Sequence, residues 1–220
     1  FVLRRPFSIF KADGTSVSVL YKRVGRGTAA MDPVASGDTV NLLGPLGNGF
    51  PTDFGDAFPV LVGGGYGVAP LYFLASRLKT PGVLFAGGRT ADDVLCADDF
   101  KAIDWPVNVC TDDGSAGAKG FVTEALDQWL AGEGAGRTAE IFACGPDGML
   151  KAVTARATDR GFNAWLSLDT HMGCGVGACL ACVCRVLEDG GKARWARVCK
   201  EGPVFECRRI GWNEEKSAKT

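Results

Sequence analysis

The stretch Cys174-Gly175-Val176-Gly177-Ala178-Cys179-Leu180-Ala181-Cys182 brings three cysteines together, and Cys199 follows after sixteen intervening residues. This C-x4-C-x2-C…C spacing is the ligand pattern of plant-type [2Fe-2S] clusters. Two irons bridged by two sulfides need thiolates from several directions, so three come from one tight loop and one from a returning segment. Glycines in the loop allow positive φ and leave room for N–H groups to face sulfur. The spacing therefore predicts a [2Fe-2S] cluster on Cys174, Cys179, Cys182 and Cys199.

Other cysteine chemistries fit this stretch less well. Zinc sites usually take C-x2-C pairs in twos, and one such pair is present here. A Rieske centre needs two histidines, whereas His171 is the single histidine of the chain. We interpret His171 as a loop or interface residue. Nine cysteines without a signal-like opening argue for metal ligation before disulfides.

The segment after the loop has a simple structural interpretation. Residues 185–187 and 195–198 flank Glu188-Asp189-Gly190-Gly191, which predicts a β-hairpin that returns Cys199 to the cluster. The last residues, 213–220, are a polar tail.

Five cysteines remain after the four ligands, and we interpret three of them as packing residues. Cys184 faces away from Cys182 if the segment is extended. Cys110 and Cys144 lie in apolar runs, where a free cysteine is usually a small buried hydrophobe. The five are Cys96, Cys110, Cys144, Cys184 and Cys207.

Before the cluster loop, strand-like and helix-like runs alternate, which is typical of a parallel, doubly wound sheet. In the last helical run Leu150, Val153 and Ala157 recur at helical spacing, which indicates core packing, and Gly161 is the expected stop. The expected strands are 59–62, 83–87, 107–111, 140–143 and 164–168, and the expected helices are 68–79, 91–100, 121–130 and 146–160.

Glycine-rich motifs follow three of these strands, at the edge where doubly wound sheets bind ligands. Gly63-Gly64-Gly65-Tyr66-Gly67-Val68-Ala69-Pro70 opens a helix, so backbone N–H groups and a helix N-terminus face a phosphate. Cys144-Gly145-Pro146-Asp147-Gly148-Met149 opens a second helix, and Gly87-Gly88-Arg89-Thr90 ends another strand. These motifs predict a dinucleotide site. Asp112-Asp113-Gly114 is interpreted as a solvated loop.

The first fifty residues contain two strand-like runs, 16–24 and 39–43, which predict a small β-meander. Three motifs accompany them. Arg5-Pro6-Phe7-Ser8 matches an R-x-x-S pattern, and Gly25-Arg26-Gly27-Thr28 is a turn whose N–H groups can cradle a pyrophosphate. The third motif is Gly44-Pro45-Leu46-Gly47-Asn48-Gly49-Phe50.

Together these motifs resemble the electron-transfer subunit of the NAD-linked, two-subunit dihydroorotate dehydrogenases, in the ferredoxin-reductase superfamily. The resemblance runs from Leu3 to about Phe205 and is most specific in residues 172–184 and 197–205. It implies an α/β plus β architecture. The expected parts are a partial, N-terminally incomplete flavin-binding β-barrel in 1–56, a doubly wound parallel-sheet NAD domain in 57–166, a small [2Fe-2S] loop and hairpin domain in 167–210, and a tail in 211–220.

The resemblance also implies roles for single residues. Arg5 is expected to meet the flavin phosphate, Ser8 to reach the isoalloxazine ring, and Cys144 to lie beside the site of hydride transfer. Expected at FAD are Arg5, Pro6, Phe7, Ser8, Gly27 and Thr28; expected at the nicotinamide cofactor are Gly63, Gly64, Gly65, Gly67, Gly88, Arg89, Gly145, Pro146 and Met149.

Two details qualify this assignment. Arg89 would suit the 2′-phosphate of NADP, but family members with a similar G-G-R run use NAD, so we expect NAD over NADP. In the family a longer stretch of barrel precedes the R-x-x-S arginine, whereas four residues precede Arg5 here. We expect the missing strands to come from the natural start of the chain or from another polypeptide.

The implied function is an electron relay in pyrimidine biosynthesis. In the family a partner subunit oxidises dihydroorotate with FMN, and electrons cross the [2Fe-2S] cluster to FAD and NAD⁺ within a heterotetramer. An equivalent subunit of a ferredoxin- or sulfide-linked NAD(P) oxidoreductase would differ in its partner. A reductase component of an oxygenase would have a longer gap before the fourth cysteine. A non-enzymatic module would keep the cluster and lack flavin and diaphorase activity.

Composition excludes other classes of function. The formal net charge of −1 provides no basic field for nucleic acid. No apolar run is long enough to span a membrane, and no signal-like segment opens the chain. We therefore expect a cytoplasmic protein without nucleic-acid or membrane partners.

Overall fold

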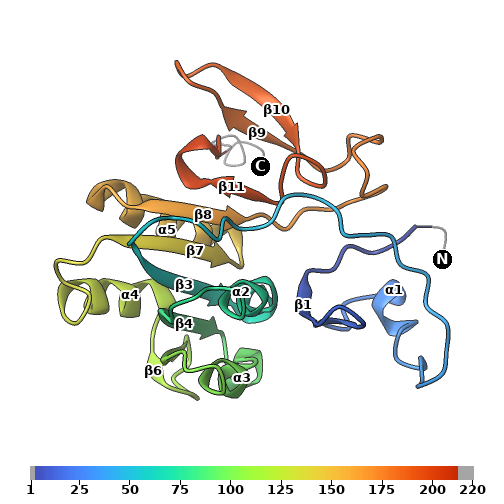
Figure 1. Cartoon of the computed structure of the whole chain (residues 1–220), viewed down its shortest axis with the longest axis horizontal. Coiled ribbons are helices and arrows are strands. Elements are labelled where there is room, and N and C mark those ends of the chain that lie inside the picture. Colours follow the sequence, from blue (N-terminus) through green and yellow to red (C-terminus); the bar gives the residue numbers. More distant parts are fainter. Residues whose placement is uncertain (1–2, 213–220) are drawn as a thin grey trace, which may run out of the picture.

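A computed structural model describes residues 3–212, whose central element is a seven-stranded sheet in the order β11-β8-β7-β3-β4-β5-β6 (Figure 1). Strands from β8 through β6 pair in parallel, and β11 pairs antiparallel with β8 at one edge. The expected parallel α/β sheet is confirmed. Its strands are β3 (Phe58–Gly64), β4 (Val83–Gly88), β5 (Val107–Thr111), β6 (Ala118–Lys119), β7 (Ala139–Cys144), β8 (Asn163–Ser167) and β11 (Val204–Glu206).

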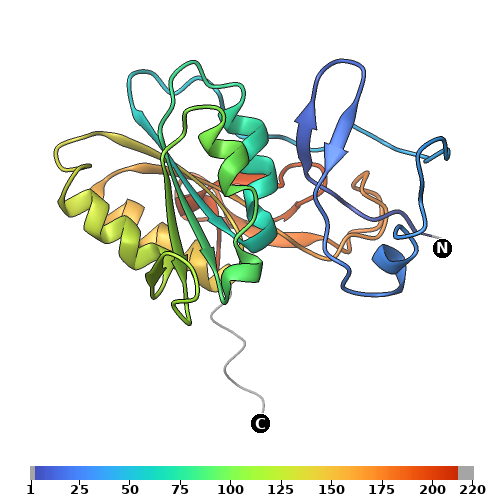
Figure 2. The same ribbon diagram turned by 90° about the horizontal axis from the view of Figure 1, so that it is seen from below.

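Both faces of the sheet are covered, as the continuous apolar runs in its strands require. Successive strand residues point to opposite faces, so Val60 and Val62 join one buried cluster and Leu61 joins the other. Figure 2 shows helices on either side of the sheet. Helices α4 (Val122–Ala131) and α5 (Asp147–Arg160) pack on the first face; α2 (Val68–Ala75) and α3 (Ala97–Lys101) pack on the second, and the short turns η1 (Gly65–Gly67) and η2 (Ala91–Asp93) follow β3 and β4.

The helices agree with the sequence patterns except where the backbone turns. The helix predicted over 91–100 is wrong in its middle, because Cys96 between η2 and α3 has a left-handed φ of 59°. The helix predicted over 68–79 ends early, at Ala75. Gly161 ends α5 with a φ of 71°, as expected. Among residues 3–212, every helix is too short or too polar to span a lipid bilayer.

The N-terminal segment forms a hairpin that packs against the second face of the sheet domain. The Phe10 ring lies 4.7 Å from the Tyr72 ring of α2, measured between centroids. Lys11 Nζ lies 2.6 Å from Asp99 Oδ1 of α3. The elements of this segment are β1 (Ile9–Ala12), β2 (Val17–Val19) and α1 (Arg26–Ala29).

Two strand predictions in this segment need correction. The strand expected over 16–24 is limited to β2. Residues 39–43 form no strand, because the apolar residues Val40, Leu42 and Leu43 lie half exposed or more and the segment pairs with no described strand. Before β3, the described residues therefore form a two-stranded sheet and no closed barrel.

The C-terminal segment contains the predicted hairpin, formed by β9 (Val183–Leu187) and β10 (Ala193–Arg197). Cys184 packs against the first buried cluster, and Cys110 and Cys144 are buried, as expected. A short turn, η3 (Cys207–Arg209), follows β11. The predicted polar tail, residues 213–220, lies outside the described residues.

The first prediction concerns Glu140, a buried carboxylate near the start of β7. Its Oε1 accepts a hydrogen bond from Trp165 Nε1 at 2.6 Å, and its Oε2 accepts one from Asn163 Nδ2 at 3.1 Å. Trp165 is half-buried and Asn163 is exposed, so the loss of their shared acceptor costs about 1–3 kcal/mol, chiefly at Trp165. We expect Glu140→Ala to lower the free energy of unfolding by about 2 kcal/mol, measured by urea denaturation. The exposed Glu133→Ala is the control, and an equal loss in both variants would contradict this role.

Candidate functional site

The three glycine-rich motifs meet at one edge of the sheet, because parallel strands end on the same side. In the register of the sheet, Gly63 of β3 lies beside Cys144 of β7, and Cys144 lies beside Ser167 of β8. On the other side, Gly64 lies beside Gly87 of β4. Ligands of doubly wound sheets bind at this edge. The structure therefore brings together the residues that the sequence assigned to the nicotinamide cofactor.

Glycines allow the loop after β3 to contact the loop after β7. A Cβ atom on Gly67 would lie 2.0 Å from the carbonyl oxygen of Cys144. A Cβ atom on Gly64 would lie 2.8 Å from Cδ of Pro146, and one on Gly145 would lie 3.0 Å from N of Gly64. Any larger residue would push the two loops apart. The glycines themselves contribute only backbone at the crossing, so the two loops can approach closely.

The remaining motif residues surround this crossing. Met149 packs its sulfur toward Gly64 and its methyl group toward Gly145. A Cβ atom on Gly63 would lie 2.7 Å from Val68, so Gly63 permits α2 to pack closely on β3. Gly65 has a φ of 54° and open space beyond it, which leaves this side of the turn accessible to a ligand.

Cys144 ends β7 with 9% of its surface exposed. Burial raises the pKa of its thiol to about 12, and the hydrogen bond with the Ser167 side chain only partly offsets this effect. At neutral pH the side chain is therefore an uncharged thiol. Sequence reasoning missed Ser167; its position at the end of the neighbouring predicted strand was the available signal.

Arg89 extends into solvent from the end of β4, with 79% of its side chain exposed. Its Nε lies 3.6 Å from Asp93 Oδ2, and its backbone N–H donates to the same oxygen at 3.2 Å. Lys22 Nζ lies 3.7 Å from the other oxygen of Asp93. Burial of Asp93 is outweighed by the Arg89 N–H and by both cations, which lower the pKa of this carboxyl. Asp93 thus offsets the cations that a 2′-phosphate would need, which favours NAD.

The arginine and the glycine turn of the N-terminal motifs are also adjacent. A Cβ atom on Gly27 would lie 2.5 Å from Nε of Arg5, so only glycine leaves room for the guanidinium. Arg5 Nη1 donates to the Leu3 carbonyl at 3.0 Å, and the side chain is otherwise exposed to solvent. A cation beside backbone N–H groups fits a phosphate of FAD.

The other flavin-motif residues differ in their surroundings. The hydroxyl oxygen of Thr28 accepts the Val24 N–H at 2.9 Å, so this side chain closes its own turn. Pro6 and Ser8 are exposed, which leaves both accessible to a ligand. The Phe7 ring lies edge-on to the Tyr21 ring, with 6.1 Å between centroids.

The four predicted cluster ligands lie as two pairs of thiols. The side chain of Cys174 contacts that of Cys179, and the side chain of Cys199 contacts that of Cys182. The N–H groups of Ala178 and Cys179 donate to Cys174 Sγ at 3.3 and 3.4 Å, and the Cys199 N–H donates to Cys182 Sγ at 3.4 Å. Two pairs of thiols with N–H partners fit a two-iron cluster, which takes two thiolates on each iron.

The loop lowers the pKa of the first predicted ligand, Cys174. Hydrogen bonds from the N–H groups of Cys179, Val176 and Ala178 lower the pKa of Cys174 to about 6, so its thiolate predominates at neutral pH. Burial and contact with Cys182 raise the pKa of Cys199 to about 11. Bound iron therefore has to displace the proton of Cys199.

The motif at residues 44–50 connects the flavin segment to the cluster. The Asn48 side chain donates to the carbonyls of Lys200 and Glu201, at 3.0 and 3.1 Å, and its backbone N–H donates to the Gly202 carbonyl at 2.6 Å. These three acceptors follow Cys199 directly. The sequence placed this motif at the end of the predicted flavin segment but did not reveal its contact with the turn that carries the predicted ligand Cys199.

The second prediction follows from the position of Asp93. Asp93→Asn keeps an oxygen for the Arg89 N–H but removes the anion that offsets Arg89 and Lys22. We expect the ratio of kcat/KM for NADPH to that for NADH to rise about tenfold, in line with ~1.4 kcal/mol of added attraction. Dye reduction by each nicotinamide measures it. Asp92→Asn removes the same charge one residue away and should leave the ratio unchanged; an equal rise there would exclude a specific role for Asp93.

Two regions of the chain match described protein families. Residues 169–211 match the iron-sulfur cluster binding domain of dihydroorotate dehydrogenase B, and residues 61–155 match the oxidoreductase NAD-binding domain. Among solved structures, one of an NADH-dependent reduced ferredoxin-NADP oxidoreductase is 33% identical, with a TM-score of 0.79 over 96% of this chain and 75% of that chain. An Amycolatopsis cytochrome P450 reductase is 30% identical, with a TM-score of 0.55 over 70% of this chain and 51% of that chain.

Curated relatives match almost the whole chain. The electron transfer subunit of dihydroorotate dehydrogenase B (NAD(+)) from Geobacillus kaustophilus is 41% identical over 219 residues, covering 95% of this chain and 80% of that protein. The subunit of the same name from Bacillus cereus strain Q1 is 40% identical over 212 residues, covering 93% and 78%. The chain therefore belongs to the family of electron transfer subunits of dihydroorotate dehydrogenase B.

Proposed function

We propose that this chain carries electrons between NAD and a catalytic partner subunit that oxidises dihydroorotate, by way of a [2Fe-2S] cluster and FAD. The names of its curated relatives support both NAD and a partner enzyme. We assign residues 1–56 to a partial flavin-binding barrel, 57–166 to a doubly wound NAD domain, 167–210 to the cluster domain and 211–220 to a tail.

One observation carries this proposal: the nicotinamide motifs and the cluster loop leave the same edge of the sheet. Cys144 ends β7, and the neighbouring strand β8 ends at Ser167. The chain then enters the cluster loop, whose first ligand is Cys174. The return strand β11 begins at this edge too, with Val204 beside Ser167. A cluster bound here would lie near a nicotinamide bound at the glycine crossing.

Three groups of residues would each bind one cofactor. Arg5, Pro6, Phe7, Ser8, Gly27 and Thr28 would hold FAD, and the glycine crossing with Cys144, Pro146, Met149, Gly88 and Arg89 would hold NAD. FAD exchanges electrons in pairs with a nicotinamide and singly with an iron–sulfur cluster. Cys144 would face the nicotinamide as an uncharged thiol, because burial keeps its proton in place. Cys174, Cys179, Cys182 and Cys199 would hold the cluster.

A partner would dock near the cluster loop. Leu180, Val183 and Trp195 are large apolar side chains that line one hollow on or next to this loop, and they are 60%, 38% and 63% exposed. Gathered apolar side chains of this kind mark interaction surfaces. We propose that the occupant is an FMN-containing catalytic subunit, in a cytoplasmic heterotetramer of two catalytic and two electron-transfer chains that serves pyrimidine biosynthesis.

A second candidate function comes from the solved neighbour. The NADH-dependent reduced ferredoxin-NADP oxidoreductase covers nearly the whole chain at a TM-score of 0.79. An equivalent subunit in a ferredoxin-linked complex would use the same cofactors with a different partner. The two candidates separate on the electron donor: dihydroorotate with the catalytic subunit in one case, and reduced ferredoxin in the other.

The third prediction tests the relay at the exposed ligand Cys179. Cys179→Ser removes one soft thiolate, so the cluster should be lost and dihydroorotate-dependent reduction of NAD⁺ by the reconstituted complex should fall about 100-fold or more. The partner's reaction with an artificial acceptor should continue. Iron content and the visible spectrum of the anaerobic chain, before and after NADH, report the cluster and the flavin directly.

Cys184→Ser is the matched control. It replaces a thiol two residues beyond Cys182 that packs against the core, and it should keep iron, flavin bands and coupling to NAD⁺. Coupling that survived in Cys179→Ser without bound iron would refute the relay. A wild-type chain whose flavin and iron spectra did not respond to NADH would refute the NAD-linked function.

A further inference from the structure

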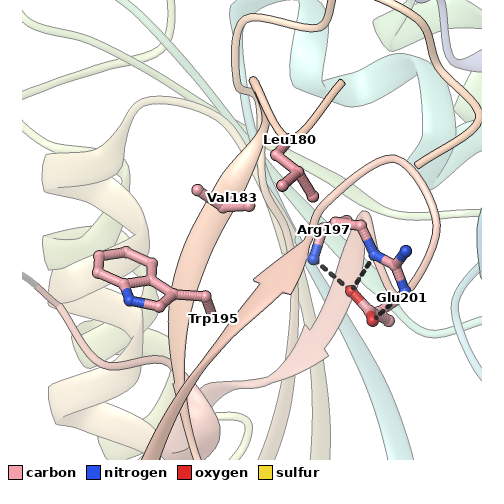
Figure 3. A pocket seen from close by; sticks show the side chains of 5 residues that line it. All are labelled: Leu180, Val183, Trp195, Arg197 and Glu201. Carbon is pink, nitrogen blue, oxygen red and sulfur yellow. Dashed lines mark hydrogen bonds and ion pairs between the residues drawn. The ribbon is translucent and has the colours of Figure 1, made fainter. Parts of the chain in front are cut away.

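Arg197 and Glu201 form a closed unit beside the cluster loop. Arg197 ends β10, two residues before Cys199. The Glu201 carboxylate binds both the guanidinium and the backbone N–H of Arg197. Nη2 of Arg197 lies 2.8 Å from Oε1 of Glu201, Nε lies 3.4 Å from Oε2, and the backbone N–H of Arg197 donates to Oε2 as well. Figure 3 shows this pair next to Leu180, Val183 and Trp195, around a hollow of about 420 Å³.

The guanidinium also reaches across to the cluster loop. Nη1 of Arg197 donates to the carbonyl oxygen of Gly177 at 3.2 Å. That carbonyl belongs to the same peptide unit as the Ala178 N–H, which donates to Cys174 Sγ at 3.3 Å. A trans peptide is planar, and its C=O and N–H point in opposite directions. Holding the oxygen from one side therefore aims the N–H at the sulfur on the other side.

The preceding peptide bond also directs its N–H toward a predicted ligand. The Gly177 N–H hydrogen-bonds to the sulfur of Cys199. Gly177 has a φ of 81°, and a Cβ atom on it would lie 2.9 Å from Lys200 and 3.6 Å from Arg197. The two peptides around Gly177 thus direct one N–H to Cys174 and one to Cys199, and Arg197 fixes the carbonyl between them.

We propose that Arg197 is a positioning residue for the cluster: it orients the Gly177–Ala178 peptide so that the Ala178 N–H stays on the sulfur of Cys174, and Glu201 holds Arg197 in place. This inference rests on the cluster assigned under the proposed function. Arg197 contacts no predicted ligand side chain, so it acts through the loop backbone.

The charges of the pair have a separate effect. A four-thiolate iron–sulfur site gains one negative charge with each electron it accepts. The Arg197 cation lies close to Cys199 and Cys182 and favours that charge, whereas Glu201 opposes it. Removing the cation and removing the anion should therefore shift the reduction potential of the cluster in opposite directions.

The test compares two ion pairs of the same hairpin region in the full chain. Arg197→Gln should release iron to a chelator about 10–100-fold faster, as expected when an outer-shell partner of a metal site is lost. At a fixed solution potential the ratio of reduced to oxidised cluster should fall about tenfold, a shift of ~59 mV for one electron. Arg194→Gln is the control, because Arg194 pairs with Glu188 at 2.8 Å within the hairpin and not with the loop.

Two further variants distinguish the effect of Arg197 on the loop geometry from the effect of its charge on the reduction potential. Arg197→Lys keeps the charge but lacks the planar guanidinium that binds Glu201 and Gly177 at the same time. The cluster should therefore keep a near-normal reduction potential and still release iron faster. Glu201→Gln should also release iron faster while raising the reduced fraction at the same solution potential. Electron paramagnetic resonance of the reduced chain follows both changes, and circular dichroism verifies the fold.

The outcomes are decisive in each direction. An Arg197→Gln chain that matched Arg194→Gln in iron release and potential would overturn the inference. If Arg197→Gln shifted the reduction potential but released iron at the normal rate, and Arg197→Lys restored the potential fully, then Arg197 would act through its charge alone. That result would overturn its positioning role. Failure of the inference alone leaves a wild-type chain with a cluster that NADH reduces, whereas a wild-type chain without iron would overturn the proposed function as well.

Discussion

The parallel pairing of β7 with β3 and β8 is the constraint on which every candidate site depends. Because these strands share one direction, Gly64, Cys144 and Ser167 end at one edge, and the loops that follow them must cross there. The antiparallel strand β11 starts at the same edge, so the segment with Cys199 also returns to it. Both faces of these strands are buried, so a slip by one residue would move each side chain into the cluster on the opposite face and disrupt the packing of both.

Close approach to a glycine backbone then shapes each site, by a second backbone in one case and by a cationic side chain in the other two. Gly67 against Cys144, Gly27 against Arg5 and Gly177 against Lys200 are contacts that a Cβ atom would block. At each of these places a loop that carries N–H groups comes next to a cation or a second loop. Anionic groups such as pyrophosphate and cluster sulfides are recognised by this chemistry. Glycine is thus the shared device of three sites that otherwise use different side chains.

The sequence predicted what is encoded over short distances. Cysteine spacing, glycine turns at strand ends and the apolar runs of the central strands predicted the sheet and grouped the motifs correctly. The pattern failed for 39–43, because alternation predicts a strand only where another strand can pair with it. It also failed at Cys96, whose left-handed φ has no signal in the residue type. Pairings across the fold, such as Lys22 with Asp93 and Arg197 with Gly177, could not be read from spacing, since they depend on how distant segments pack.

The turn at residues 197–202 is where the three parts of the chain are joined. Asn48, from the N-terminal segment, donates hydrogen bonds to the carbonyls of this turn. Arg197 and Glu201 pair with each other within it. The carbonyl of Pro203, directly after the turn, accepts the Leu168 N–H of the sheet domain at 2.9 Å. Cys199 sits within this turn. The hydrogen bonds that Asn48 and Leu168 donate therefore tie the segment with the predicted ligand Cys199 to both neighbouring parts of the chain.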